Sequence, residues 1–95
     1  MSAVLQTNFD AAAFKSTTRT QWQAAADAWH RWGPFVGSWL GEATETMLDL
    51  AQVGPGCRVL DVAAGAGEQS LVAARRVGPQ GHVLATDIAP ALLEH

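Results

Sequence analysis

The chain has 95 residues, a net charge of −3 at pH 7, 48% apolar residues and 16% charged residues. This length allows at most one small domain, and the composition argues against disorder throughout. The negative charge provides no basic surface, so nucleic acid is not an expected partner. Because no apolar stretch is long enough to span a bilayer and no secretory leader is evident, we expect a cytoplasmic protein with no membrane span.

The first third of the chain predicts one helix. Residues 1–19 show no clean apolar period, and we expect low order there. Thr20 and Gln23 have the spacing of a capping box, so a helix should begin at Thr20. It should end at Gly33 and Pro34, which together form a strong stop signal.

A second helix is predicted over residues 38–52, where apolar residues recur at helical spacing. Gly54, Pro55 and Gly56 then turn the chain toward its next element. We therefore divide the chain into an N-terminal helical cap segment, residues 1–53, and a segment of strands and helix, residues 54–95.

The second segment has the order strand, glycine loop, helix and strand. A β-branched and leucine run predicts a buried parallel strand over 58–62, and a helix is expected over 68–77. A second strand is predicted over 82–86. Between the first strand and the helix, Gly65 and Gly67 allow backbone conformations and close ligand approach that other residues hinder. This order is typical of a nucleotide-type binding site.

The acids near this loop narrow the choice of ligand. Asp87 ends the second strand about twenty residues beyond Gly67, where a carboxylate can accept hydrogen bonds from ribose hydroxyls. A dinucleotide site typically has glycine or alanine where this chain has Ser70. Asp61, in the first strand, suits a cationic ligand better than a pyrophosphate. A sulfonium carrying an ammonium group is such a ligand.

Two segments resemble the class I S-adenosylmethionine-dependent methyltransferases. Residues 59–68, VLDVAAGAGE, are similar to the first motif of that family, and residues 81–90, GHVLATDIAP, to its second-strand motif. Ala63, where most members have glycine, is similar to the branch of ubiquinone and menaquinone biosynthesis methyltransferases. The resemblance implies an α/β fold, namely the N-terminal part of a Rossmann-like doubly wound domain with two cap helices and one βαβ unit.

The resemblance also implies a function and a set of site residues. The cofactor would be S-adenosyl-L-methionine and the acceptor a small molecule, with the chain inactive as an isolated fragment. Asp61 would help to place the methionine end, Asp87 would bind the ribose and Ile88 would pack on the adenine. Trp32 or His30 could face the active site. The implied cofactor-binding residues are Asp61, Ala63, Gly65, Ala66, Gly67, Asp87 and Ile88.

Other interpretations remain open at this stage. Asp61 could cap the loop, and Asp87 could cap the next helix. The chain could instead be a fragment of an NAD(P)-dependent oxidoreductase, or a non-catalytic binding or assembly module that forms homo-oligomers through exposed strand edges. No metal-ligand spacing occurs, no catalytic residue is evident, and carbon, oxygen, nitrogen and arsenic acceptors are all open.

Overall fold

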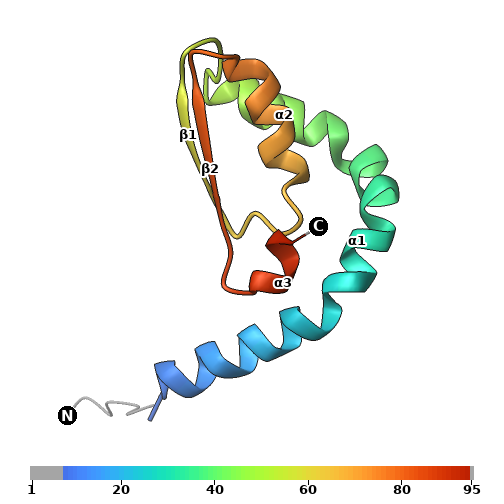
Figure 1. Cartoon of the computed structure of the whole chain (residues 1–95), viewed down its shortest axis with the longest axis vertical. Helices are drawn as coiled ribbons and strands as arrows, with labels where there is room; N and C mark the ends of the chain where they lie inside the picture. The colour runs from blue at the N-terminus through green and yellow to red at the C-terminus, as the bar shows by residue number, and fades with distance from the viewer. Residues whose placement is uncertain (1–7, 95) are drawn as a thin grey trace, which may run out of the picture.

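In the computed structural model, a long helix curves around a small unit of two strands and two shorter helices (Figure 1). The structure describes residues 8–94, so residues 1–7 of the segment 1–19, where low order is expected, lie outside the described residues. The elements in chain order are α1 (Ala11–Leu50), β1 (Arg58–Val62), α2 (Glu68–Val77), β2 (His82–Thr86) and α3 (Pro90–Leu93).

Helix α1 begins earlier than predicted. Its N-cap is Asp10, whose carboxylate accepts a hydrogen bond from the Ala13 N–H at 3.0 Å. An aspartate at this position satisfies one of the backbone N–H groups that a helix start leaves unpaired. The predictions of low order up to residue 19 and of a helix start at Thr20 are therefore wrong for the described residues.

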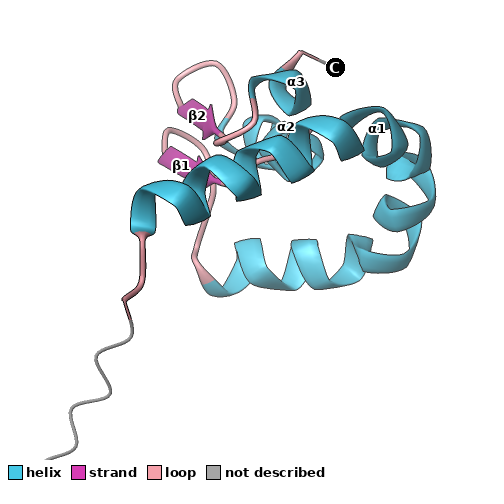
Figure 2. Cartoon of the chain, turned by 90° about the horizontal axis from the view of Figure 1, so that it is seen from below, coloured by secondary structure: helices cyan, strands magenta, loops and turns pink. Residues whose placement is uncertain are grey.

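The predicted stop at Gly33 and Pro34 is also wrong, because α1 continues through both residues. Proline removes one helical hydrogen bond and crowds the preceding turn, which bends a helix without necessarily ending it. Figures 1 and 2 show α1 curving along its length, and the two predicted helices are its two halves.

Contacts with the rest of the chain hold both halves of α1. Near its start, the Gln23 side chain accepts a hydrogen bond from the Ala91 N–H at 2.7 Å. Near its end, the Gln69 side chain donates to the Thr44 hydroxyl at 3.1 Å. These contacts favour one bent helix because each half is fixed against a different element, the first against α3 and the second against α2.

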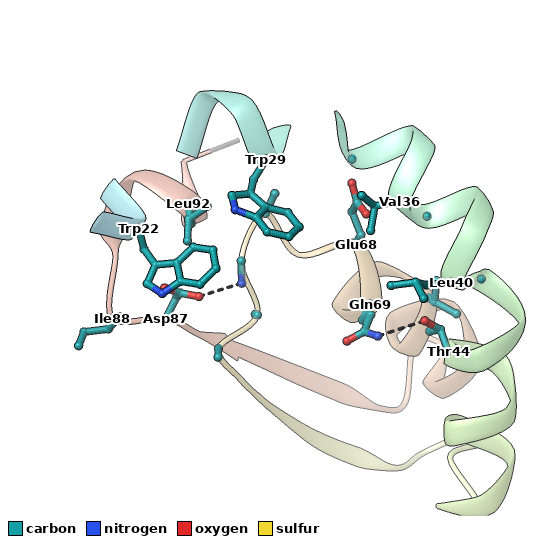
Figure 3. A pocket seen from close by; sticks show the side chains of 18 of the residues that line it. Trp22, Trp29, Val36, Leu40, Thr44, Glu68, Gln69, Asp87, Ile88 and Leu92 are labelled. Carbon is teal, nitrogen blue, oxygen red and sulfur yellow. Dashed lines mark hydrogen bonds between the residues drawn. The ribbon is translucent and has the colours of Figure 1, made fainter. Parts of the chain in front are cut away.

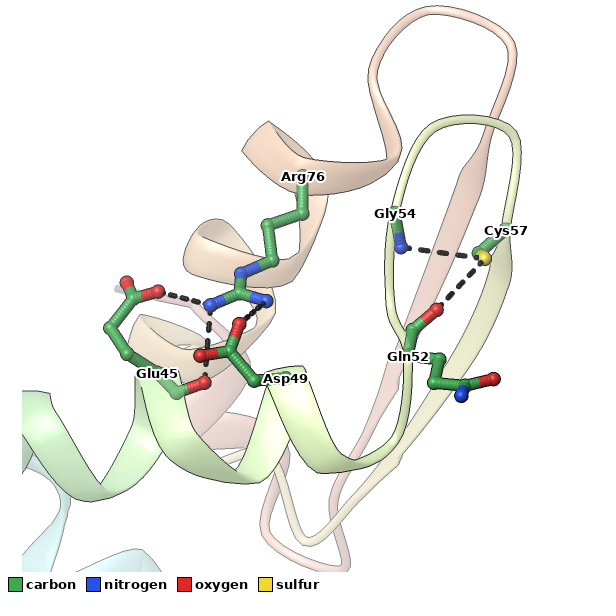
Figure 4. A network of polar contacts seen from close by, with 6 residues as sticks. All are labelled: Glu45, Asp49, Gln52, Gly54, Cys57 and Arg76. Carbon is green, nitrogen blue, oxygen red and sulfur yellow. Dashed lines mark hydrogen bonds and ion pairs between the residues drawn. The ribbon is translucent and has the colours of Figure 1, made fainter.

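A charged cluster adds to the contact between α1 and α2 (Figure 4). Arg76 donates to the Glu45 carboxylate and carbonyl and, at 2.6 Å, to the Asp49 carboxylate. Hydrogen bonds to Glu45 first, and then to Asp49, raise the pKa of Arg76 above its already high ordinary value. The guanidinium therefore stays charged, and it ties α2 to the last turns of α1.

The strands confirm the predicted βαβ unit. Strands β1 and β2 pair in parallel, with Arg58 opposite His82 and Val62 opposite Thr86, and α2 connects them. Only one face of this pair is covered within residues 8–94. Leu60, Val62 and Leu84 lie on the other face and are 62%, 72% and 53% exposed. On the covered face Val59 and Asp61 are only half-buried, so the expected burial of the first strand is wrong for the described residues.

A core of small side chains joins α1 to the end of the βαβ unit. Ala26 of α1 is buried together with Ala89 and Leu92, which lie just after β2. Alanines allow the backbones to approach closely, so this contact brings the first half of α1 over the carboxyl ends of the strands. That placement creates a cavity between α1 and the strand ends.

Candidate functional site

The loop between β1 and α2 is fastened to the end of β2. The Ala64 N–H donates to the Thr86 carbonyl at 2.8 Å, and the Gly65 N–H donates to the Asp87 carboxylate at 2.9 Å. In the opposite direction, the Thr86 hydroxyl donates to the Asp61 carbonyl at 3.1 Å. These three bonds hold the loop in one conformation beside Asp87.

Three loop residues adopt positive φ angles. Gly65 and Gly67 have φ of 61° and 85°, which glycine adopts without a Cβ penalty. Ala63 has φ of 59°, a conformation that costs a non-glycine residue roughly 1–2 kcal/mol. The loop at the end of β1 therefore retains backbone strain at Ala63, as residues at binding sites often do.

A cavity of about 490 Å³ lies over this loop (Figure 3). Its volume falls within the range that holds small-molecule ligands and cofactors. Helix α1 forms one wall, and the loop, the start of α2 and the end of β2 form the other. Residues of both walls line the cavity, among them Trp22, Trp29, Gly33, Ala63, Gly65, Ala66, Glu68, Asp87, Ile88 and Leu92.

Five of the seven predicted site residues line the cavity, namely Ala63, Gly65, Ala66, Asp87 and Ile88. Asp61 and Gly67 are not among the lining residues. The Asp61 carboxylate accepts a hydrogen bond from the Ser70 hydroxyl at 2.6 Å, and Gly67 is the N-cap of α2. Both residues therefore stabilise the loop and the start of α2 without lining the cavity.

The carboxylate of Asp87 is engaged on both oxygens. One oxygen accepts from the Gly65 N–H and the other from the Ala89 N–H at 2.9 Å. Each carboxylate oxygen has a second lone pair, so these bonds leave acceptor capacity for a ligand. The alternative in which Asp87 is the N-cap of the next helix is wrong, because the N-cap of α3 is Ala89 and α3 has no side-chain cap hydrogen bond.

The aromatic residues of α1 that face the cavity differ from the predicted ones. Trp22 and Trp29 line the cavity, whereas Trp32 and His30 do not. Trp32 instead lines a smaller neighbouring cavity with Ala28, Trp29 and Val36. Trp22 and Trp29 are seven residues apart and so share one face of a helix. Trp32 follows Trp29 by three residues and also has helical spacing to it, so spacing alone does not separate the three tryptophans.

The charged side chains of the cavity lining are all acidic within the described part of the chain. Glu45, Glu68 and Asp87 contribute carboxylates, and no Lys, Arg or His is among the lining residues within the described part of the chain. Arg76 pairs with Glu45 and with Asp49, so the charge of Glu45 is compensated and the net negative charge of the lining comes from Glu68 and Asp87. Such a lining favours a ligand that carries positive charge and disfavours a pyrophosphate.

Gly33 makes room for Glu68 in this wall. A Cβ at Gly33 would lie 1.9 Å from a carboxylate oxygen of Glu68, so alanine there would displace the acid. The glycine that forms part of the predicted helix stop therefore leaves room for the Glu68 carboxylate against α1.

Comparison with known proteins identifies the family. The family model described as protein-L-isoaspartate(D-aspartate) O-methyltransferase (PCMT) matches residues 38–95, more than half of the chain. The chain belongs to this methyltransferase family. The resemblance to S-adenosylmethionine-dependent methyltransferases, inferred from residues 59–68 and 81–90, is confirmed.

Curated methyltransferases are similar to the chain over parts of their length. An arsenite methyltransferase of Halobacterium salinarum is 39% identical over 57 residues, which cover 60% of this chain and 15% of that protein. The ubiquinone/menaquinone biosynthesis C-methyltransferase UbiE of Bordetella avium is 46% identical over 46 residues, or 48% of this chain and 18% of that protein. The chain thus spans less than a fifth of the length of these relatives.

No solved structure matches the chain. Within residues 8–94, none of the helices combines the length and the apolar character that crossing a membrane requires.

Proposed function

We propose that this chain forms the S-adenosyl-L-methionine-binding part of a methyltransferase that acts on a small-molecule acceptor. The observation that carries the proposal is the acidic cavity over the loop that Gly65 and Asp87 hold together. A sulfonium with an ammonium group is cationic, and an adenosine ribose offers hydroxyl donors to a carboxylate. The cavity lining complements both features.

Each predicted residue has a role in this proposal. Asp87 accepts hydrogen bonds from the ribose, and Ile88 packs against the adenine. The backbone of Ala63, Gly65 and Ala66 passes beneath the ligand, where the absence of large side chains permits close approach. Asp61 and Gly67 act indirectly, because Asp61 fixes Ser70 and Gly67 begins α2.

When bound, the cofactor would supply an electrophilic methyl group to an acceptor nucleophile, with the thioether as leaving group. The contribution of this chain is placement and exclusion of water, which can provide much of the rate enhancement in a reaction between two bound molecules. The walls formed by Trp22, Trp29 and Leu92 are apolar, so they desolvate the bound ligand.

An oxidoreductase is the less favoured alternative. A nicotinamide dinucleotide carries a pyrophosphate, which Glu68 at the start of α2 would repel, and no basic residue of the described lining offsets that repulsion. The matched family and the matched relatives are methyltransferases by description.

Calorimetric titration of the chain with S-adenosylhomocysteine and, separately, with NAD tests this proposal. We expect S-adenosylhomocysteine to bind more tightly, because its ammonium group meets an acidic lining and it has no pyrophosphate. S-adenosyl-L-methionine carries an additional sulfonium charge and should bind more tightly than S-adenosylhomocysteine, and raising the salt concentration should reduce that difference, since the additional attraction is electrostatic. Tighter binding of NAD, or no binding of S-adenosylhomocysteine, would overturn the proposal.

A further inference from the structure

We propose that the indole of Trp22 stacks on the nucleobase of the bound ligand and is therefore a further binding residue of this site. This inference rests on the proposed function, because it requires an adenosine-containing ligand beside Asp87. Trp22 lies on α1, outside both motifs on which the family resemblance depends.

The placement of Trp22 supports this role. Its indole lines the same cavity as Asp87 and Ile88, and Figure 3 shows it at the Asp87 end, with Trp29 farther along over the loop. A ribose held by Asp87 brings the attached base to this end of the cavity. Trp22 supplies the aromatic surface nearest to that position among the residues labelled in Figure 3.

The exposure of Trp22 indicates that its ring is available to a ligand. The residue is 40% exposed although it lies on the face of α1 that carries the buried Ala26. Its ring centroid is 5.7 Å from that of Trp29, with the planes tilted by 45°, so the two indoles do not stack face to face. A planar base could therefore pack on the Trp22 ring.

Neighbouring contacts fix the position of the helix segment that carries Trp22. The adjacent residue, Gln23, bonds to the Ala91 N–H, and Ala26, one turn later, packs against Ala89 and Leu92. These contacts fasten this part of α1 to the segment that follows Asp87. The base would thus bind between elements that are already fixed relative to each other, which lowers the entropy cost of ordering the protein on binding.

Titration of the Trp22→Leu and Trp22→Phe variants with S-adenosylhomocysteine and with 5′-methylthioadenosine tests the proposal. Stacking between a base and an aromatic side chain contributes about 1–3 kcal/mol, so Trp22→Leu should weaken both ligands by about 5- to 150-fold. Trp22→Phe should retain most of the affinity because it keeps a ring. Trp39→Leu is the matched control, since Trp39 is 74% exposed and lines neither of the two cavities.

The outcomes separate this inference from the proposed function. Unchanged affinity of Trp22→Leu for both ligands would overturn the role of Trp22 alone. A loss confined to S-adenosylhomocysteine would also overturn it, because that loss would place Trp22 at the amino-acid end. Failure of the unmodified chain to bind either ligand would overturn both proposals. If Trp22→Leu does not fold, magnetisation transfer between the base and the Trp22 indole in the unmodified chain decides the question, and its absence contradicts stacking.

Discussion

Gly65→Val is expected to weaken the binding of S-adenosylhomocysteine by about 100-fold or more, because a β-branched side chain would block the close approach of the ligand to the loop backbone. Gly65 has φ of 61°, which a β-branched residue adopts only with strain. A Cβ at this position meets no atom within 4 Å, so the protein itself does not exclude the side chain. The new side chain would instead occupy the space above the loop.

Gly56→Val is the matched control for this variant. Gly56 has φ of 81°, and a Cβ there would also meet open space, but this glycine lies in the turn before β1 and does not line the cavity. Both variants should lower the melting temperature to a similar extent, whereas only Gly65→Val should lose ligand affinity. Equal affinities of the two variants would show that the ligand does not lie over the loop.

Asp87→Ala should weaken binding by about 1.5–3 kcal/mol, or roughly 10- to 150-fold, the scale of hydrogen bonds to a charged group. The substitution removes the proposed ribose acceptor and also the acceptor for the Gly65 N–H. Asp87→Asn retains one acceptor oxygen and should show a smaller loss. Asp49→Ala removes an exposed acid far along α1 and should leave affinity unchanged.

A comparison of adenosine with 2′-deoxyadenosine separates the two roles of Asp87. If its carboxylate binds the ribose, removal of the 2′-hydroxyl should weaken binding to the unmodified chain but have little effect on Asp87→Ala. If Asp87 acts only through the loop, both proteins should discriminate equally between the nucleosides. That second result would contradict direct contact.

The βαβ unit was predictable from sequence because its signals are local. Gly65 and Gly67 lie within five residues of the β-branched and leucine run that ends at Val62. Gly78 ends α2 with φ of 65° at its C-cap, as a strong stop signal predicts. The parallel pairing of β1 and β2 follows from the length of the helical connection between them.

The continuity of α1 was not predictable in the same way. Gly33 and Pro34 form a local stop signal, but the tertiary contacts of Gln23 and Thr44 hold the helix on both sides of it. The tertiary contacts of the first half of α1 with α3 decide which of its aromatic side chains face the cavity, so Trp22 could not be selected over Trp32 by helical spacing alone.

Amide chemical shifts of the ¹⁵N-labelled chain during titration with S-adenosylhomocysteine test the central claim most directly. The claim predicts saturable shifts at Gly65, Ala66 and Ile88, which line the cavity at the carboxyl ends of the strands. It predicts little change at Cys57 and Gly81, which directly precede the amino ends of β1 and β2. Shifts confined to that opposite end, or no shifts at any amide, would contradict a cofactor site over this loop.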